Sequence, residues 1–412
     1  MRLINNLNSQ KRLFINGIER VVVNQLVRAP GVYFAGEIEP ATGRMLFSGE
    51  IRPLRGSWLE FNVGRNDVIS VKVDRRRKFS TTLFLRAFGL STDQEILRIF
   101  EPFDNNSEHC YIAATLEKDP TKSQDEALLE IYRRMRPGDP AVLENAKSLF
   151  NNMFFNPRRY SLGEVGRYKI EKKLREIKLI LEKKGLKTDQ SSQVLEPTDF
   201  IGALAYLVHL SNGQGQVDDI DHLGNRRLRR VGELVQQNAF RVGMLRLERV
   251  IRERMTLIPS DSLPSPATLV NARPVISAVN EFFRSSQLST ILDQTNPLSE
   301  LDNLRRVSVM GTGGITRERA SFSIRDINHS QYSRICPIRS PEGPNIGLVT
   351  YMALFAKVNK YGFLEAPYRR VIKVKGRPKV TSEVVYLAAD DEEEFYITHA
   401  DLAIDKNGFI QD

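Results

Sequence analysis

Residues 310–326 read MGTGGITRERASFSIRD, a glycine-rich turn followed by the charge cluster Arg317-Glu318-Arg319 and an apolar/polar alternation. The run GTGGIT lacks the Gly-Lys-Ser/Thr ending of a nucleotide-binding P-loop, so no lysine is placed for the β- and γ-phosphates. The glycines permit a close approach of the backbone to a ligand, and the arginines that follow can grip a phosphate or stack on a base. The alternative is a hairpin with a local Arg–Glu pair.

A second stretch, RICPIRSPEGPNIGLV at 334–349, is interrupted repeatedly by proline and glycine. This pattern predicts a rigid, irregular wall with the side chains of Arg334, Glu342 and Asn345 at its surface. Rigidity of this kind suits a binding site.

The length of 412 residues exceeds the roughly 250–300 at which single cores stop growing, so we expect two or more domains. Sixty Lys and Arg against fifty Asp and Glu give a net charge of +10. This balance favours a polyanionic partner such as nucleic acid, although many basic proteins merely solvate their charge.

Cys110 and Cys336 lie far apart, and His109 is the only histidine beside either of them. Their spacing predicts neither structural zinc nor a disulfide framework. No apolar run is long enough for a signal sequence or a membrane span. We therefore expect a soluble chain of a reducing compartment.

The sequence pattern changes along the chain from strand-like to helix-like, which predicts an α+β, multidomain fold. The β-branched runs at 19–27 and 69–79 predict strands, with turn signals between them. The segments DEALLEIYRRMRPG (125–138) and TDFIGALAYLVHLSNG (198–213) place apolar residues at helical spacing, and we expect Thr198 to cap the second helix.

Two basic segments are also predicted to be helical. Residues 169–190 predict a basic, partly amphipathic helix that presents either a solvated face or a surface for phosphates. A second basic helix is expected at about 230–256, and the Pro/Ser-rich stretch 259–268 is a plausible domain boundary. The acidic run AADDEEEF (388–395) predicts a solvated turn and no metal site, because its carboxylates are consecutive and do not converge.

Three segments, at 285–301, 305–326 and 336–349, resemble the rifamycin-region and fork-loop segments of the β subunit of bacterial-type (bacterial or plastid) DNA-directed RNA polymerase. Further segments resemble the same subunit in the family's order, among them INGIERVVVNQLVRAPGVYF, RGSWLEF, VDRRRKF, EIYRRMRPGDP, NPRRYSLGEVGRYK, VDDIDHLGNRRLRRVGE and YGFLEAPYRRV. The resemblance covers nearly all of the chain, most weakly at 101–123 and 184–197.

The resemblance implies five regions within about a third of a β subunit. They are the end of a first protrusion segment (1–25), the lobe (26–230), a second protrusion segment (231–300), the fork loop and rifamycin region (301–350) and the start of the following β segment (351–412). It leaves open whether Asp412 is a natural end or a truncation, and whether the source is bacterial or plastid.

The resemblance also implies a part in transcription, as a subunit of a nucleotidyltransferase that acts on DNA and RNA. In the family the magnesium is held by an aspartate motif of β′, so we expect no cofactor, no metal site and no catalytic residue in this chain, and no activity when it is isolated. The implied partners are β′, α, the remainder of β and a sigma factor, with no membrane, in a bacterial nucleoid or a plastid stroma. The alternatives are a stand-alone nucleic-acid-binding module and a self-sufficient nucleotidyltransferase, and the second would need a convergent carboxylate set.

A pocket that reads a base of the non-template strand is implied at positions that match the family's motif. Its residues would be Arg28, Asp221, Arg226, Ile315 and Ile324. An aspartate can accept from the N1–H and N2–H groups of guanine, and aliphatic side chains can flank a base. The alternative for Asp221 is a cap at the start of a helix.

A rifamycin pocket beside the RNA path is implied in the same way. Its residues would be Gln25, Leu288, Thr290, Asp293, Asn303, Arg306, Ser308, Met310, Pro341, Glu342, Asn345 and Val349. The family usually has Gln at Thr290, His at Asn303, Lys at Leu304 and Glu at Arg339. Because these changes remove or shorten hydrogen-bonding side chains, we expect weakened rifamycin binding.

The resemblance also implies a role for the glycine-rich stretch 310–326. Gly311, Gly313 and Gly314 would shape the fork loop, with Arg317 and Arg319 near the fork and the RNA. Basic groups would hold the phosphates of both strands by a salt-dependent, sequence-independent attraction.

Overall fold

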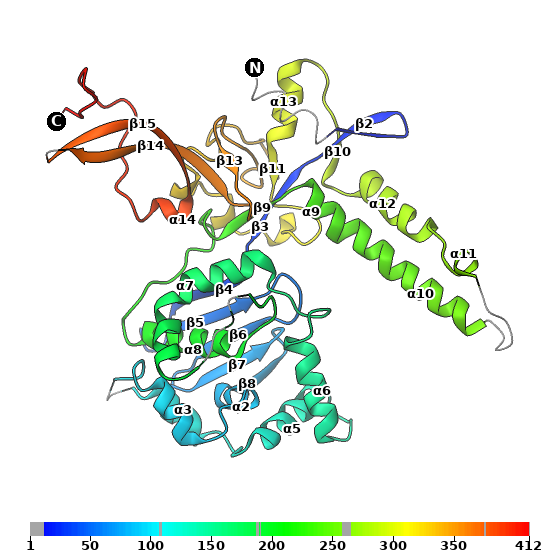
Figure 1. The fold of residues 1–412 in the computed structure, drawn as a ribbon, viewed down its shortest axis with the longest axis vertical. Helices are drawn as coiled ribbons and strands as arrows, with labels where there is room; N and C mark the ends of the chain where they lie inside the picture. The colour runs from blue at the N-terminus through cyan, green and yellow to red at the C-terminus, as the bar shows by residue number, and fades with distance from the viewer. Residues whose placement is uncertain are drawn as a thin grey trace. The chain divides into compact units, whose positions relative to one another are not determined.

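The computed structural model describes residues 12–106, 109–186, 189, 191–257, 265–374 and 376–411. Most of the expected boundary at 259–268 and most of the first half of the expected segment 1–25 lie outside the described residues. The chain divides into two compact units, an inserted unit (Ala29–Asp219) and a flanking unit (Met1–Arg28 with Ile220–Asp412). Both mix helices with sheets, which confirms the α+β, multidomain prediction (Figure 1).

The inserted unit is built on a five-stranded antiparallel sheet in sequential order. Its strands are β4 (Gly31–Ile38), β5 (Met45–Arg52), β6 (Leu59–Val63), β7 (Ile69–Val73) and β8 (Arg77–Ser80). In β6, Leu59, Phe61 and Val63 are buried while the residues between them are half-buried. This alternation follows from the two-residue period of a strand with one face on the core.

Helices complete the inserted unit, and α7 and α8 lie against strands β4 and β5 (Figure 1). The helices are α2 (Thr81–Ala87), α3 (Asp93–Phe100), α4 (Tyr111–Glu117), α5 (Gln124–Met135), α6 (Leu143–Phe154), α7 (Gly163–Lys183) and α8 (Pro197–Ser211). The predicted helices within 125–138 and 198–213 are confirmed as α5 and α8. The expected cap at Thr198 is wrong, because Glu196 and Asp199 form a capping box and Pro197 opens the helix.

The basic helix expected at 169–190 is α7, and part of its charge is neither solvated nor available to phosphates. Lys178 is buried and lies 2.9 Å from a carboxylate oxygen of Asp199, which also accepts from Arg167 at 2.8 Å. These partners join α7 to α8. Opposite charges that are buried together in this way satisfy one another, and removing one of them leaves an uncompensated buried charge.

The described residues of the flanking unit form three sheets, ordered β1-β2-β10, β12-β11-β3-β9 and β13-β14-β15. Their strands are β1 (Arg12–Ile15), β2 (Ile18–Val22), β3 (Asn24–Arg28), β9 (Arg226–Arg229), β10 (Ser289–Ile291), β11 (Arg306–Ser308), β12 (Val349–Tyr351), β13 (Lys357–Val358), β14 (Leu364–Val374) and β15 (Arg377–Ala388). In the second sheet β3 pairs antiparallel with β9 and parallel with β11. With β12 paired to β11, this sheet gathers four segments that are distant in the sequence.

The helices of the flanking unit include the second predicted basic helix. They are α9 (Val231–Val235), a π-helical turn (Gln236–Phe240), α10 (Arg241–Leu257), α11 (Pro266–Leu269), α12 (Arg273–Ser285), α13 (Pro297–Arg305) and α14 (Ala389–Glu392). Short 3₁₀ turns lie at Arg317–Arg319, Ser323–Arg325 and His329–Gln331. Among the described helices of the chain, none is both long enough and apolar enough to cross a membrane.

Candidate nucleic-acid interface

The predicted base-reading residues meet at the β3–β9 pair. Arg28 stands opposite Arg226 in the antiparallel register, and a carboxylate oxygen of Asp221 lies 3.7 Å from Nη1 of Arg226. Asp221 precedes a turn in which the amide of Arg226 donates to the carbonyl of His222 at 3.1 Å. The alternative of a helix cap at Asp221 is wrong, because this turn leads into a strand.

The two predicted isoleucines join the same region. Ile315 and Ile324 are half-buried and pack against the hydrophobic cluster that contains Leu26 of β3 and Leu228 of β9. The side chain of Asp221 keeps 23% of its surface exposed, whereas that of Arg226 keeps 7%. A partly exposed carboxylate oriented by a buried guanidinium is suited to accept hydrogen bonds from the edge of a base.

The side chain of Gln25 holds the glycine-rich turn by hydrogen bonds to its main chain. Its side-chain Nε2 donates to the carbonyl oxygens of Met310 and Thr312 at 3.1 Å each, and its Oε1 accepts from Arg229 at 3.2 Å. Arg229 in turn donates to Gln237 at 2.5 Å. Gln25 is fully buried, so its amide is engaged within the protein.

The glycines of this turn are required by space and by backbone conformation. A Cβ on Gly314 would lie 2.3 Å from the carbonyl oxygen of Val309 and 2.8 Å from Nε2 of Gln25. Gly311 has φ +104° and packs on Leu288, and Gly313 has φ +77°. The turn can therefore be built only from residues without a side chain at these places.

Beyond the turn, Arg317, Glu318 and Arg319 form an exposed 3₁₀ turn. Residues 315–326 contain no strand, so the alternative of a hairpin is wrong. Within the described parts of the chain, the side chains of Arg317 and Arg319 make no ion pair. Their guanidinium groups face solvent and are available to phosphate.

The residues predicted for the rifamycin pocket come from β3, β10, α13, β11 and β12, from the chain next to β10 and β11, and from the loop before β12. Sheet pairing places Ser308 beside both Gln25 and Val349. The buried members are Gln25, Leu288, Asn303, Ser308 and Met310. The half-buried members are Thr290, Arg306, Pro341, Asn345 and Val349, and the exposed ones are Asp293 and Glu342.

Two of these side chains have a buried polar atom without a hydrogen-bond partner in the described part of the chain. Oγ1 of Thr290 and Oδ1 of Asn345 are shielded from water, and neither finds a hydrogen-bond partner among the described residues. By contrast, Asn303 donates to the carbonyl of Ser299 at 3.2 Å, and Asp293 accepts from Thr295. The hydrogen bonds from Thr295 hold the pKa of the exposed Asp293 carboxyl below its usual range.

The positions that depart from the family's pattern have local partners. Leu304 is buried against Val21 and Leu292, where a lysine head group would have no place. Arg339 pairs with Asp302 at 2.9 Å and lies over the ring of Tyr351, 4.7 Å from its centroid. Both departures are thus accommodated by packing and by charge.

One expectation about side-chain position is wrong, and a second holds only in part. Arg334 is fully buried, and its guanidinium donates to the carbonyls of Ser330, Leu364 and Leu387 and pairs with Glu392. An arginine surrounded by carbonyl oxygens can be buried because these oxygens replace its hydrogen bonds to water. The sequence did not reveal this environment, since the carbonyls come from distant segments. The acidic run at 388–395 is a solvated turn only in its second half, where Glu393 and Glu394 are exposed. Its first half forms α14, and Glu392 of that helix pairs with Arg334.

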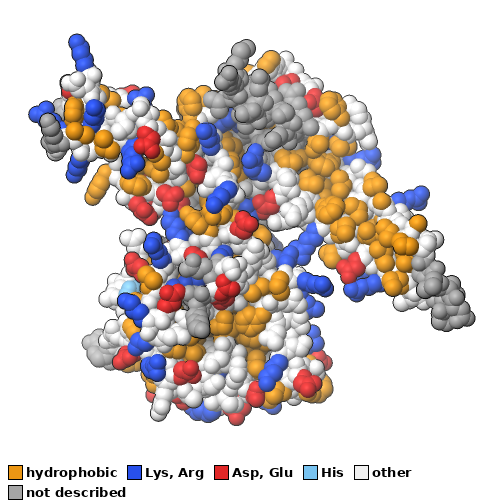
Figure 2. Space-filling view, viewed as in Figure 1, with side chains coloured by type: hydrophobic (Ala, Val, Ile, Leu, Met, Phe, Trp, Pro, Cys, Tyr) orange, Lys and Arg blue, Asp and Glu red, His pale blue; other side chains and the backbone are white. Residues whose placement is uncertain are grey.

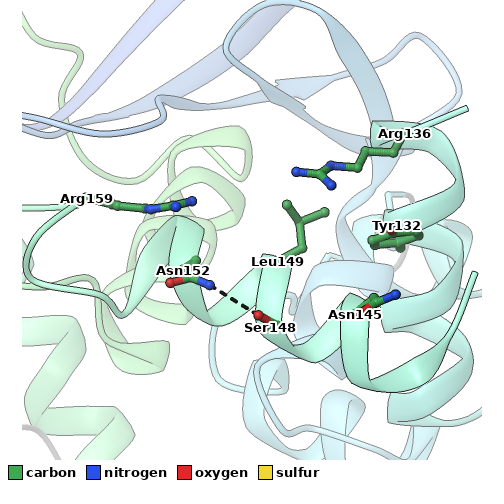
Figure 3. Close-up of a pocket in the computed structure, with 7 residues that line it drawn as sticks. All are labelled: Tyr132, Arg136, Asn145, Ser148, Leu149, Asn152 and Arg159. Carbon is green, nitrogen blue, oxygen red and sulfur yellow. Dashed lines mark hydrogen bonds between the residues drawn. The ribbon is translucent and has the colours of Figure 1, made fainter. Parts of the chain in front are cut away.

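A basic hollow in the inserted unit was missed by the sequence reasoning. Figure 3 shows Arg136, at the end of α5, and Arg159, after α6, pointing toward one another above α6. Tyr132, Asn145, Ser148, Leu149 and Asn152 complete a hollow of about 300 Å³. Two guanidinium groups with amide and hydroxyl neighbours can hold an anion. The available signal was the RRMRPG and NPRRY segments at either end of α6.

A larger and mostly apolar cavity of about 650 Å³ lies in the flanking unit. Arg305 and Tyr351 line it, and Tyr351 also accepts from Nε of Arg306 at 3.2 Å. Burial lowers the pKa of the Arg305 guanidinium, which donates to the carbonyls of Met352 and Leu354. Arginine nevertheless stays charged, since its ordinary pKa is so high.

Comparison with known proteins agrees with this architecture. The family model described as RNA polymerase Rpb2, domain 2, matches residues 28–229, and that of RNA polymerase Rpb2, domain 3, matches 290–358. The RNA polymerase beta subunit external 1 domain matches 368–412. These matches define the class, that of multisubunit RNA polymerase proteins.

Curated relatives narrow the class to one subunit. The DNA-directed RNA polymerase subunit beta of Chloroflexus aggregans is 50% identical over 396 residues, covering 91% of this chain and 32% of the relative. That of Dehalococcoides mccartyi is 45% identical over 445 residues, covering 96% and 34%. The chain belongs to the family of bacterial DNA-directed RNA polymerase β subunits, and it spans about a third of the length of these relatives.

Proposed function

We propose that the chain acts in transcription as part of a DNA-directed RNA polymerase, which is a nucleotidyltransferase. In that complex it would hold downstream DNA, the non-template strand and the nascent RNA beside an active site supplied by β′. The observation that carries the proposal is the convergence of Arg28, Asp221 and Arg226 at the β3–β9 pair. A carboxylate beside a pair of facing arginines offers both a base-reading group and phosphate-binding groups.

In this proposal the regions have separate tasks. The lobe at 26–230 would contact DNA, with Arg136 and Arg159 as further phosphate contacts. The protrusion segments at 1–25 and 231–300 would flank the fork and rifamycin region at 301–350, and 351–412 would begin the next β segment. Arg317 and Arg319 are exposed where the fork loop would meet nucleic acid.

The finer assignments follow from family membership. Magnesium would be held by β′, and DNA, RNA, β′, α, the remainder of β and sigma would be the partners, in a bacterial nucleoid or a plastid stroma. The isolated chain would be inactive. This chain's own residues would bind and orient strands, and proton and phosphoryl chemistry would take place on β′.

The surface of the flanking unit favours assembly over a stand-alone binding module. Figure 2 shows hydrophobic side chains gathered over α10 and α12, and Met244, Leu245 and Ile276 of these helices are exposed. In the run 349–356, Leu354 and Phe355 are exposed while its ends are partly or fully buried. Exposed apolar patches of this kind mark protein–protein contacts.

The test is a native pull-down of this chain from its source cells, with mass spectrometry of the proteins recovered. Recovery of β′ and α, together with RNA synthesis by the recovered complex, is the expected result. A chain recovered alone, or with nucleic acid only, would overturn the proposal in favour of the stand-alone module. A matched pull-down with Met244→Asp and Leu245→Asp should lose the protein partners and keep nucleic acid, if these side chains face a subunit.

A further inference from the structure

Three side chains from distant segments of the flanking unit converge, and one of them, His222, directly follows Asp221 of the candidate base pocket. His222 lies in the turn before β9, His329 opens a 3₁₀ turn, and Glu393 follows α14. One nitrogen of each histidine and one oxygen of the glutamate all lie within 4.8 Å of one another. The spacing in the sequence follows no metal-binding motif, so only the fold brings the three groups together.

We propose that His222, His329 and Glu393 bind a transition-metal ion of the zinc class. Nε2 of His222 lies 3.1 Å from Oε1 of Glu393, and Nε2 of His329 lies 3.9 Å from the same atom. Bond lengths of about 2.0–2.2 Å require ligand atoms roughly 3.3 Å apart around a tetrahedral ion. The two distances to Glu393 already approach this value, and rotation of the exposed His329 side chain can bring the two histidine nitrogens, which lie within 4.8 Å, to the same spacing.

Burial divides the site into a fixed ligand and movable ones. His222 is 8% exposed at its side chain, whereas His329 and Glu393 are 75% and 61% exposed. The turn that carries His222 is tied to the 3₁₀ turn, because the amide of Leu223 donates to Oγ of Ser330 at 2.9 Å. One ligand is therefore held in place, and the other two can adjust to an ion that arrives from solvent.

The chemistry of the ligands selects the ion. Two imidazoles and one carboxylate suit Zn²⁺, Co²⁺ or Ni²⁺, whereas Mg²⁺ and Ca²⁺ prefer oxygen ligands alone. Further carboxylates of the run 390–394 lie next to Glu393 in the chain and favour a cation electrostatically. Three protein ligands leave a position for water.

The proton of His222 must move when the ion binds. Nδ1 of His222 accepts from the amide of Gly224 at 3.1 Å, so in the metal-free form Nε2 carries the proton and donates it to Glu393. Coordination through Nε2 places that proton on Nδ1, and the hydrogen bond from Gly224 is lost. The N–H of the buried Gly224 then faces a second donor, and a buried donor left without an acceptor reduces affinity by roughly 5- to 150-fold. This cost weakens binding, but it is smaller than the binding free energy that a zinc site can supply.

The test is to titrate the 412-residue chain with Co²⁺ and, separately, with Zn²⁺. Binding of Co²⁺ is followed by its visible absorption, and binding of Zn²⁺ is measured by competition with a chromophoric chelator. The variants are His329→Asn and Glu393→Gln, whose exposed side chains can be changed without disturbing the fold. His399→Asn, an exposed histidine of the same unit, is the matched control. We expect one ion per chain, at least tenfold weaker binding in the two variants, and unchanged binding in the control.

Thermal unfolding gives a second readout, since an ion that binds only the folded chain raises the midpoint temperature. Zn²⁺ should raise it in the unmodified chain and in His399→Asn, and not in His329→Asn. Binding that is equal in all variants, or that falls equally in the control, would show only scattered surface histidines and would overturn the site. The absence of Co²⁺ absorption in the unmodified chain would do the same.

Discussion

The side-chain amide of Gln25 donates to the main-chain carbonyl of Met310 across 3.1 Å, and 285 residues separate the two in the sequence. A second bond from the same nitrogen reaches Thr312, and Oε1 of Gln25 accepts from Arg229. The amide is thus shared between the glycine-rich turn and strand β9. This relationship makes β3 the support of the glycine-rich turn at 310–314.

Removing that amide should loosen the loop. Gln25→Ala leaves two carbonyls and one guanidinium without their partner, which we expect to lower the free energy of unfolding by about 1–3 kcal/mol. Amide hydrogen exchange at 310–319 should become faster than elsewhere in the flanking unit. Gln294→Ala, at an exposed glutamine, is the control, and equal exchange in both variants would contradict the role of Gln25.

The turn should not tolerate a side chain at Gly314. Gly314→Ala places a Cβ against the carbonyl of Val309 and the amide of Gln25, so we expect a loss of about 1–3 kcal/mol in the free energy of unfolding. Gly232→Ala is the matched control, because a Cβ there meets nothing within 4 Å. Urea unfolding should show the control unchanged or stabilised by up to about 1 kcal/mol.

Asp221 should read guanine. In polymerase assembled with Asp221→Ala, we expect the preference for guanine over adenine at the contacted non-template position to fall by about 1–3 kcal/mol. Competition between labelled non-template oligonucleotides that differ at this base measures the change. Asp401→Ala, which removes an exposed carboxylate elsewhere, should keep the preference, and a preference retained in Asp221→Ala would rule out this pocket.

Rifamycin should inhibit the assembled enzyme weakly. Each missing hydrogen bond to the drug costs about 1 kcal/mol, or roughly fivefold in affinity. Restoring the usual residues with Thr290→Gln and Asn303→His should therefore lower the half-inhibitory concentration. Inhibition curves of the two enzymes test this, and an unmodified enzyme as sensitive as an ordinary bacterial polymerase would refute it.

Asp93 should make the stability of the inserted unit depend on acid. Hydrogen bonds from the buried Arg86, and then from Lys122, lower the pKa of the Asp93 carboxyl. Because the folded-state pKa lies below the unfolded value, the stabilisation is present above about pH 4 and is lost as the pH falls through the folded value.

Asp93→Asn measures that contribution. Urea unfolding from pH 7 down to pH 3 should show the unmodified chain more stable at pH 7, with the difference shrinking below about pH 4. Asp139→Asn, at an exposed pair whose charges lie 3.9 Å apart, should show little difference at any pH. A constant difference between the chain and Asp93→Asn would contradict the assignment.

The sequence by itself determined the local elements and the family. β-Branched runs predicted β2, β3, β7 and β8, and helical spacing predicted α5, α7 and α8, because these periods depend on neighbours within a few residues. The glycine-rich turn and its arginines were likewise visible at 310–326. These features depend on contiguous residues, so they can be predicted without knowing which other segments of the chain pack against them.

Only the tertiary structure decided which of these residues are exposed and what they touch. Arg334 was expected at the surface and is buried, since its carbonyl partners come from β14, β15 and the 3₁₀ turn at 329–331. The meeting of Gln25 with Met310, and of His222 with Glu393, likewise depends on strand pairings between distant segments. A single sequence does not encode such pairings in any local period, because hydrogen bonds and ion pairs depend on the distance and orientation of groups in space and not on their separation along the chain.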